Sequence, residues 1–264
     1  MNTIVMELKA SMAFVIRNFN LVKRHAAWES VFLIYNVVNV LTIGYIGYGD
    51  PHKILYLIVG SLLWGFLSVL FHDVAEAVAW ERWEGTIEYT FMAPIHRITY
   101  LLGHSIFAII YAIGRSVIIM ALVSLFFKIS LAQANIMTTF VIIFFASFSF
   151  LGMGLIAAVL PLLSPERGAQ ASHIFQAIIL LISGVYYDIS VLPAWIRPFS
   201  MISPGTYTLR AIRKAMLENA SVADLWSDIT ILIIIGIILI PTGMWVFAKA
   251  EHHAKVKGKL SRNG

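Results

Sequence analysis

The sequence predicts an all-α integral membrane protein, and three observations lead to this fold class. Hydrophobic residues make up 59% of the 264 residues and charged residues only 12%, whereas a soluble domain carries about 25% charged residues. The apolar residues gather in runs of about 20, the length that crosses a bilayer as a helix. These runs lack strand-type alternation, and an isolated strand cannot satisfy its backbone hydrogen bonds in lipid.

Residues 1–22 are predicted to form an amphipathic helix that lies in the membrane interface. Charged and amide side chains interrupt any apolar core of the kind that a cleavable signal peptide requires. We expect the chain to turn into the bilayer near Lys23 and Arg24. The apolar residues recur three and four positions apart, as on one helix face: Val5, Leu8, Met12, Val15, Ile16 and Phe19.

Six apolar runs follow, and we expect about six transmembrane helices. No internal repeat and no second soluble domain stands out, so residues 1–264 are expected to form a single transmembrane domain. The predicted spans are residues 28–47, 54–74, 100–127, 136–160, 172–189 and 229–248.

The basic residues near the span ends predict that both termini lie in the cytoplasm, with the protein in the cell membrane. In this orientation the cytoplasmic segments hold most of the lysines and arginines, as the positive-inside rule requires. Residues 249–264 then form a basic cytoplasmic tail in contact with anionic membrane lipids. No basic-aromatic module accompanies this tail, so nucleic acid is not an expected partner.

A polar segment, residues 75–99, separates the second and third spans and must lie at one membrane surface. We expect the second span to continue as a helix to Glu84, where Gly85 breaks it. Thr86 is predicted to cap a new short helix over residues 86–93, with Glu88 in its first turn and Pro94 at its end. Such a segment is either an ordinary polar loop or a helix that inserts into a partner protein.

The stretch 190–228, between the last two spans, is predicted to be an extracellular loop that contains short helices. Pro193 begins a proline-punctuated aromatic stretch that suits the interface. Ser203 reads as a helix N-cap with Pro204 at the first helical position, and Asn219 ends this helix. Its two predicted faces are an apolar stripe of Leu209, Ile212 and Met216 and a basic face of Arg210, Arg213 and Lys214.

Several chemistries have no support in the sequence. The phosphate-binding pattern GxxxxGK[ST] and the zinc pattern HExxH do not occur. The chain has no cysteine, which excludes disulfides, thiolate nucleophiles and cysteine-ligated metals. His252 and His253 are adjacent and would point to different sides of a helix. We therefore expect no catalytic residue, bound cofactor or metal in this chain.

Polar residues inside the predicted spans are costly in lipid and are therefore candidates for function. They either pack the helices together or line a substrate pathway. Arg115 lies close to mid-depth, so we expect it to pair with Glu29, Asp73 or Glu76 or to face a polar cavity. The candidate residues are Asn36, Asn39, His72, His104, Tyr111 and Arg115.

Two blocks of the chain resemble type-2 ABC exporter permeases. Residues 81–88, Glu-Arg-Trp-Glu-Gly-Thr-Ile-Glu, with Pro94 following, resemble the cytoplasmic segment of that family, where charged residues lead into Gly-Thr and a Glu. Ser-Gly-Val-Tyr-Tyr at 183–187, Leu-Pro at 192–193, Pro-Gly-Thr-Tyr at 204–207 and Arg213 resemble its signature near the fifth span. Gly205 departs from the bulkier apolar residue usual in the family, and we expect it to loosen the start of the outer helix.

The resemblance covers essentially the whole chain and implies the membrane-spanning subunit of an ATP-driven ABC exporter. Such a subunit forms a homodimer and works with two copies of a separate ATPase subunit, which holds ATP and Mg²⁺. The expected substrate is an amphipathic or hydrophobic molecule: a drug, a lipid or a lipid-linked glycan. The implied ATPase-coupling residues are Glu81, Arg82, Glu84, Gly85, Thr86, Glu88 and Pro94, with a minor contact at Pro165, Glu166 and Arg167. The implied outer gate comprises Pro193, Pro204, Gly205, Tyr207 and Arg213.

Two other functions are compatible with an apolar chain of this length. An intramembrane enzyme would use polar groups such as His72, His104 and Arg115, which form no recognisable motif here. An ion-coupled secondary transporter often contains internal repeats and broken paired helices, and neither is found in this sequence. A co-purifying ATPase subunit would distinguish the exporter from both.

Overall fold

The structure is a computed structural model that describes residues 3–93, 95–129 and 134–257. Within these ranges the chain is helical throughout its regular structure and contains no strand. Five helices of the described part are long and apolar enough to cross a membrane, and Gln170–Ser183 is a shorter apolar helix. The prediction of an all-α integral membrane protein is confirmed, and the expected six spans correspond to five long helices and one short one.

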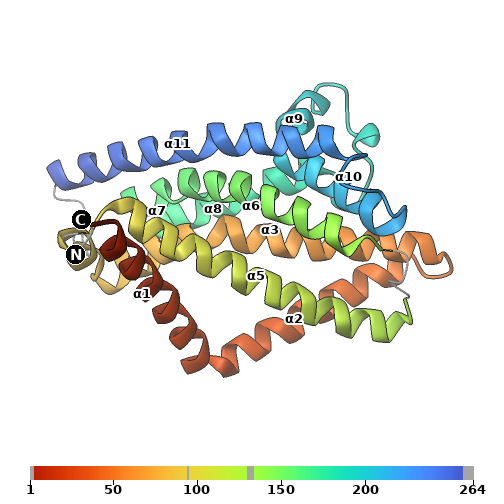
Figure 1. The fold of residues 1–264 in the computed structure, drawn as a ribbon, viewed down its shortest axis with the longest axis horizontal. Coiled ribbons are helices and arrows are strands. Elements are labelled where there is room, and N and C mark those ends of the chain that lie inside the picture. Colours follow the sequence, from red (N-terminus) through yellow and green to blue (C-terminus); the bar gives the residue numbers. More distant parts are fainter. Residues whose placement is uncertain (1–2, 94, 130–133, 258–264) are drawn as a thin grey trace.

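The long helices lie side by side, and α1 and α2 form a V against the rest (Figure 1). The start of α1 and the end of α11 lie together with the end of α3 and the start of α5; we call this the α4 end. The α2–α3 turn lies at the opposite end with α9 and α10 (Figure 1). The elements are α1 (Thr3–Arg24), α2 (Ala26–Ile46), α3 (Pro51–Glu84), α4 (Ile87–Met92), α5 (Arg97–Phe127), α6 (Ile136–Ala157), α7 (Val159–Leu163), α8 (Pro165–Ser183), η1 (Ile189–Val191), α9 (Arg197–Ile202), α10 (Pro204–Leu217) and α11 (Trp226–Val256).

The helix boundaries follow local chemistry. Asp50 caps α3 by accepting the backbone N–H groups of His52 and Lys53 at 3.0 and 3.2 Å, and Pro51 occupies the first turn. Gly85, at φ 74°, ends α3 in the left-handed conformation that glycine adopts without strain. Gly184, at φ 71°, ends α8 in the same way. The predicted end of the fifth span at residue 189 is therefore wrong.

Two other predicted boundaries differ from the structure. The fourth span was predicted as one helix to residue 160, but α6 ends at Ala157 and a short helix, α7, follows. The last helix continues to Val256, well into the segment predicted as a basic tail. Residues 258–264 lie outside the described residues.

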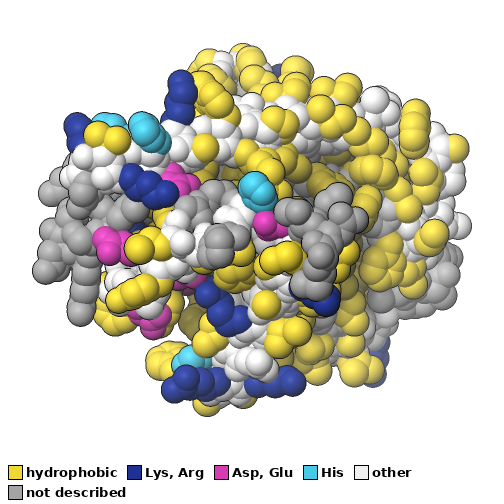
Figure 2. Space-filling model, turned by 60° about the vertical axis from the view of Figure 1, so that its left-hand side comes forward, with side chains coloured by type: hydrophobic (Ala, Val, Ile, Leu, Met, Phe, Trp, Pro, Cys, Tyr) yellow, Lys and Arg dark blue, Asp and Glu magenta, His cyan; other side chains and the backbone are white. Residues whose placement is uncertain are grey.

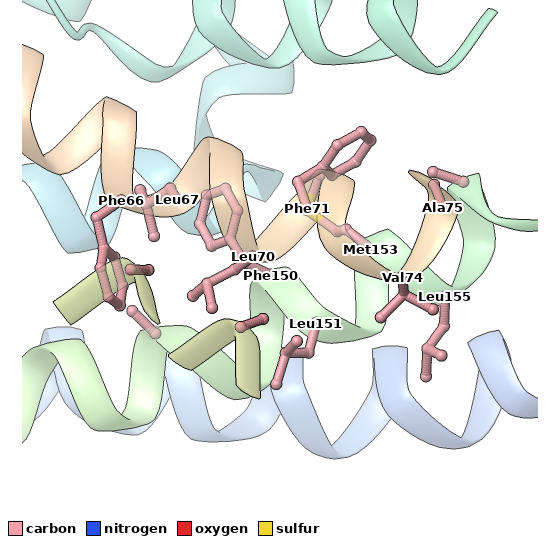
Figure 3. Close-up of a cluster of buried hydrophobic side chains, with 14 of the residues drawn as sticks. Phe66, Leu67, Leu70, Phe71, Val74, Ala75, Phe150, Leu151, Met153 and Leu155 are labelled. Atoms are coloured by element: carbon pink, nitrogen blue, oxygen red, sulfur yellow. The ribbon is translucent and has the colours of Figure 1, made fainter. Parts of the chain in front are cut away.

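The packing of α3 against α6 forms the centre of the core. Phe66, Leu70 and Phe71 of α3 are buried against Phe150 and Met153 of α6 (Figure 3). Because lipid is as apolar as these side chains, close packing rather than escape from water holds such helices together. The α3 backbone accordingly comes close to a small residue of α6: a Cβ added at Gly154 would lie 2.8 Å from the carbonyl oxygen of Phe71.

Helix α11 packs on the other side of α6 through the same kind of close approach. A Cβ added at Gly152 would lie 2.6 Å from the Cβ of Leu239, and one added at Gly243 would lie 2.8 Å from the Cβ of Leu155. The Ser149 hydroxyl donates across this contact to the carbonyl of Leu232 at 2.8 Å. These glycines therefore set the distance between the two helix backbones.

Replacing Gly152 by alanine should destabilise the protein, although alanine is the better helix former by about 1 kcal/mol. The added methyl group meets backbone and Cβ atoms of α11, and such overpacking costs about 1–3 kcal/mol. Gly114→Ala on α5 is the matched control, because no described atom lies within 4 Å of its added Cβ. Thermal unfolding in detergent should show a lower Tm for Gly152→Ala alone. An equal Tm for both variants would contradict the close approach.

Candidate coupling surface and polar sites

Helix α4 has one face attached to the bundle and one face open. Ile87 and Phe91, four residues apart, are 0% and 5% exposed and join the main hydrophobic core. Tyr89 and Met92 are 77% and 81% exposed, and the carboxylate of Glu88 is exposed in the first turn. The short helix is therefore held by two apolar anchors and presents an aromatic, a thioether and an acidic side chain outward.

The connection between α3 and α4 is a tight turn around Gly85. The backbone N–H of Thr86 donates to the Glu81 carbonyl at 2.9 Å, and the N–H of Gly85 donates to the Arg82 carbonyl at 3.2 Å. The Thr86 hydroxyl also lies 3.4 Å from the Glu81 carbonyl and makes no capping bond to α4. Thr86 occupies the predicted N-cap position of α4 but makes no side-chain capping bond, because its hydroxyl lies against the end of α3 instead.

Helix α3 itself runs unbroken into this surface. Its 34 residues correspond to about 50 Å of helix, which exceeds the bilayer hydrocarbon thickness of about 30 Å. The predicted extension of the second span to Glu84 is confirmed. Helix α3 therefore reaches, as one continuous helix, from one end of the molecule to the other (Figure 1).

Glu81 and Arg82 do not lie on the open surface. Both are buried, and the Arg82 guanidinium donates to the Leu162 carbonyl of α7 at 2.7 Å. This bond ties the end of α3 to the α7–α8 turn. Any part that these two residues play in coupling is therefore internal rather than by direct contact.

The remaining predicted coupling residues have different positions. Glu84 is the last residue of α3 and is exposed. The minor contact predicted at Pro165, Glu166 and Arg167 falls in the first turn of α8, at positions whose side chains lie outside the described part of the structure. Pro94 likewise lies outside the described residues.

Helix α1 is attached to α3 and α5 by polar contacts. Arg17 forms an ion pair with Glu81 at 3.0 Å. The Ser11 hydroxyl donates to the Thr99 carbonyl at 2.9 Å, and the Thr99 hydroxyl donates to the Glu7 carboxylate. These contacts fix α1 to the region where α3 ends and α5 begins.

His104, predicted as an intramembrane polar residue, completes this attachment. It is buried, with Nδ1 at 3.1 Å from the Asn18 side-chain nitrogen and Nε2 at 3.2 Å from Arg17. The Asp73 carboxylate of α3 lies 3.8 Å from Nδ1. His104 thus joins α1, α3 and α5, which is a structural role.

The outer face of α1 is apolar and exposed at Leu8, Met12 and Ile16. This stripe suits the acyl side of a membrane interface. Charged and histidine side chains gather at the α4 end, turned forward in Figure 2, and hydrophobic side chains cover the surface behind it. The two features match a helix at the boundary between water and lipid.

Arg115 of α5 belongs to a short polar chain. Its guanidinium donates to the Tyr111 hydroxyl and to the Phe32 carbonyl of α2, each at 3.3 Å. The Tyr111 hydroxyl in turn donates to the Glu29 carboxylate. Of the carboxylates expected to pair with Arg115, Glu29 is therefore linked to it through the Tyr111 hydroxyl. Arg115 also borders a small pocket, which Asn36 helps to line.

The other polar residues of the spans do not converge on one centre. Asn36 and Asn39 donate to carbonyls of their own helix, at 2.7 and 3.2 Å. His72 bonds to Gln176 of α8, and its ring lies 4.7 Å from that of His173. These contacts pack the helices together. His72, His104 and Arg115 each contact a different set of partner residues.

At the opposite end, Arg213 links three elements. Its guanidinium donates to the Gly184 carbonyl at 3.0 Å and lies 3.5 Å from the centroid of the Tyr56 ring on α3. Burial lowers the pKa of Arg213, and the fields of Tyr56 and Asp188 oppose this effect. Of the three residues predicted on the basic face of the outer helix, Arg210 and Lys214 are exposed, whereas these partners draw Arg213 inward.

The start of α10 packs tightly on the end of α8. The Ser203 hydroxyl makes no helix cap and instead pairs with the Ser183 hydroxyl at 2.8 Å. A Cβ added at Gly205 would lie 2.4 Å from the Ser183 hydroxyl oxygen. The expected loosening at Gly205 is therefore not observed, since its missing side chain allows the close contact.

The other predicted gate residues flank this contact. Pro204 is buried in the first turn of α10, and the Tyr207 hydroxyl donates to the Met201 carbonyl at 2.6 Å. Pro193 is exposed. An ion pair between Arg210 and Asp228, not predicted from the sequence, joins α10 to α11.

The residues that attach α4 and α1 to the rest of the bundle were not predicted from the sequence. The spacing of Ile87 and Phe91 is a usable signal, because two apolar residues four apart in a short surface helix mark its buried side. The pairing of Arg17 with Glu81 joins residues 64 positions apart. No local pattern predicts such a contact.

The family described as ABC-2 type transporter matches residues 10–217. The chain is also similar to a protein named "Probable multidrug ABC transporter permease YbhR" in Escherichia coli strain K12 and in Escherichia coli O157:H7. Each is 22% identical over 159 residues, which are 60% of this chain and 43% of the relative, so the match spans less than half of those proteins. The chain belongs to the ABC-2 type transporter family, as a non-catalytic transmembrane subunit.

Proposed function

We propose that this protein is the permease of an ATP-driven exporter and moves an amphipathic or hydrophobic substrate out of the cytoplasm. The observation that carries the proposal is the open face of α4, with Tyr89 and Met92, at the tip of an unbroken α3. Drugs, lipids and lipid-linked glycans are the substrate classes. The name of the relative YbhR, a multidrug permease, favours the first class.

The energy enters through a partner. The sequence contains no phosphate-binding GxxxxGK[ST] pattern, so ATP and Mg²⁺ are held by a separate ATPase subunit, two copies of which serve a homodimer of this chain. The ATPase docks on the open face of α4. Both termini then lie in the cytoplasm, because the start of α1 and the end of α11 share the α4 end (Figure 1).

Movement passes from α4 to the membrane because α4 cannot swing freely. Ile87 and Phe91 anchor it in the core, so a displacement on ATP binding moves α3. Helix α1 follows through the ion pair of Arg17 with Glu81. At the far end, the contact of Arg213 with Tyr56 of α3 and with the Gly184 carbonyl transmits the movement to the outer gate.

The two other functions have less support. An intramembrane enzyme needs its polar groups to converge on one substrate, whereas His72, His104 and Arg115 are bound to separate partners. An ion-coupled secondary transporter gives no account of an exposed, anchored helix at the end of α3. The exporter accounts for that helix directly.

Tyr89→Ala should weaken the binding of the ATPase by at least about tenfold, the loss of 1.4 kcal/mol typical of an exposed aromatic that becomes buried in an interface. Tyr48→Ala is the matched control, because Tyr48 is 78% exposed at the opposite end of the molecule. Binding of purified ATPase to each variant in nanodiscs measures the difference. Equal affinities for both variants would exclude α4 as the docking site.

Gly85→Pro should abolish export while the protein still inserts into the membrane. Proline fixes φ near −65° and has no N–H, whereas Gly85 has φ 74° and donates to the Arg82 carbonyl. Glu84→Lys, a charge reversal on the exposed side, should also impair export. Export in proteoliposomes and membrane yield are the two measurements. Wild-type export in both variants would rule out coupling through this turn.

Arg17→Ala should destabilise the protein by about 1–2 kcal/mol, a value reduced because the arginine is partly exposed. The loss arises because the buried Glu81 carboxylate is left without its ion-pair partner. Adding Glu81→Gln to Arg17→Ala should recover part of the stability. Lys9→Ala, an exposed position on the same helix, is the control. A Tm that falls equally for Lys9→Ala, or no recovery in the double variant, would contradict the attachment.

A further inference from the structure

Arg115 is a half-buried residue well inside the length of α5, with a pocket beside it. It is 18 residues after Arg97 and 12 before Phe127, the ends of α5, about 27 Å along the helix. The pocket lies between α2, α3 and α5, helices that run close together in Figure 1, and Asn36, Ser61 and Ser116 line it with Arg115. A cation and three polar side chains therefore meet inside the membrane-spanning part.

The guanidinium has more donors than the described residues use. Its two hydrogen bonds, to Tyr111 and Phe32, are both 3.3 Å, longer than the roughly 2.7–2.9 Å of charge-assisted bonds. No described carboxylate forms an ion pair with it; Glu29 contacts the Tyr111 hydroxyl instead. An arginine at such depth is costly in a membrane, and an anionic ligand would offset this cost.

The pocket is small, and its lining is part polar and part apolar. An added Cβ at Gly65 of α3 would meet no described atom within 4 Å, so the site is open there. Val40, Leu62 and Ile119 supply apolar walls. The hydroxyl of Ser61 and the amide of Asn36 each donate to a carbonyl of their own helix, and both side chains line the pocket.

The geometry points to a binding site for the anionic headgroup of a membrane amphipath, with a phosphate, sulfate or carboxylate oxygen on Arg115. The planar guanidinium binds such groups with two parallel N–H donors. The tail lies along the apolar surface of α2, where Phe32 and Tyr35 are exposed. The amphipath is either a resident lipid or the exported substrate; only the second identification rests on the proposed function.

Glu29 gives the site a signature that a purely structural arginine lacks. Its carboxylate, held by Tyr111 next to Arg115, repels an incoming anion. Glu29→Gln should therefore strengthen anion binding, whereas Arg115→Gln should weaken it. A loss of packing alone would weaken binding in both variants or in neither.

The test compares two probes that share their acyl chains: fluorescent phosphatidic acid, which is anionic, and fluorescent diacylglycerol, which is neutral. Binding to the full chain in phosphatidylcholine nanodiscs should favour the anionic probe. Arg115→Gln should reduce that preference about tenfold, which corresponds to 1.4 kcal/mol. Arg115→Lys should keep part of it, and Glu29→Gln should increase it.

A matched pair of asparagines separates the pocket from the rest of α2. Asn36→Leu should reduce the preference for the anionic probe, because Asn36 lines the pocket. Asn39→Leu loses the same kind of bond to its own helix outside the pocket lining and should leave the preference unchanged. No preference in the wild type, or an unchanged preference in well-folded Arg115→Lys, Glu29→Gln and Asn36→Leu, would overturn the site.

The source of the amphipath is decided in proteoliposomes with the ATPase subunit. ATP-dependent removal of the anionic probe from the inner leaflet identifies a substrate, and binding without removal identifies a resident lipid; both support the site. If the complex exports no member of a drug, lipid and glycan panel, the proposed function fails while the nanodisc result stands. If export is normal but the charge preference is absent, the site alone fails.

Discussion

The packing of α3 against α6 is the interaction on which the rest of the structure depends. Lipid offers no hydrophobic driving force between helices, so the contact relies on shape: Phe66, Leu70 and Phe71 meet Phe150, and Gly154 lets the backbones approach. Helix α11 packs on the far side of α6, and α2, α5, α8 and α10 pack around α3. Because α3 packs against other helices along its length, its two ends are mechanically connected.

Helix α3 connects the two ends of the molecule. At the α4 end, Gly85 turns the chain, and the core anchors of α4 join it to α3. At the other end, the Arg213 guanidinium lies over the ring of Tyr56 and donates to the carbonyl of Gly184. The polar residues inside the bundle divide between these tasks: His104 holds α1 in place, whereas Arg115 keeps unused donors beside a pocket. Only the second kind of residue is suited to a ligand.

Composition and periodicity were enough to predict the helical class, the extension of α3 to Glu84 and the break at Gly85, because each depends on residues close in sequence. The surroundings of Arg213 and the ion pair of Arg17 with Glu81 could not be predicted in this way. Each depends on a partner far along the chain: Arg213 bonds a carbonyl 29 residues away, and Arg17 pairs with a carboxylate 64 residues away. Membrane spans of similar composition give no signal for which helix faces meet. The sequence could therefore supply candidate site residues through motifs, but only the contacts in the structure separate the packing residues from those that border a pocket.

The central claim is that α1, α3 and α4 move as one unit when the ATPase acts. The chain has no cysteine, so spin labels at single introduced cysteines report without background. Labels at Thr86, exposed beyond the Gly85 turn, and at Asn20, exposed on α1, can be placed in one copy of the dimer and measured by double electron–electron resonance. The account predicts the same Thr86–Asn20 distance in the nucleotide-free and ATP-bound complexes, while the distance between Thr86 labels on the two copies changes. A change of the Thr86–Asn20 distance as large as the change between copies would show that the turn at Gly85 absorbs the movement, and would contradict the account.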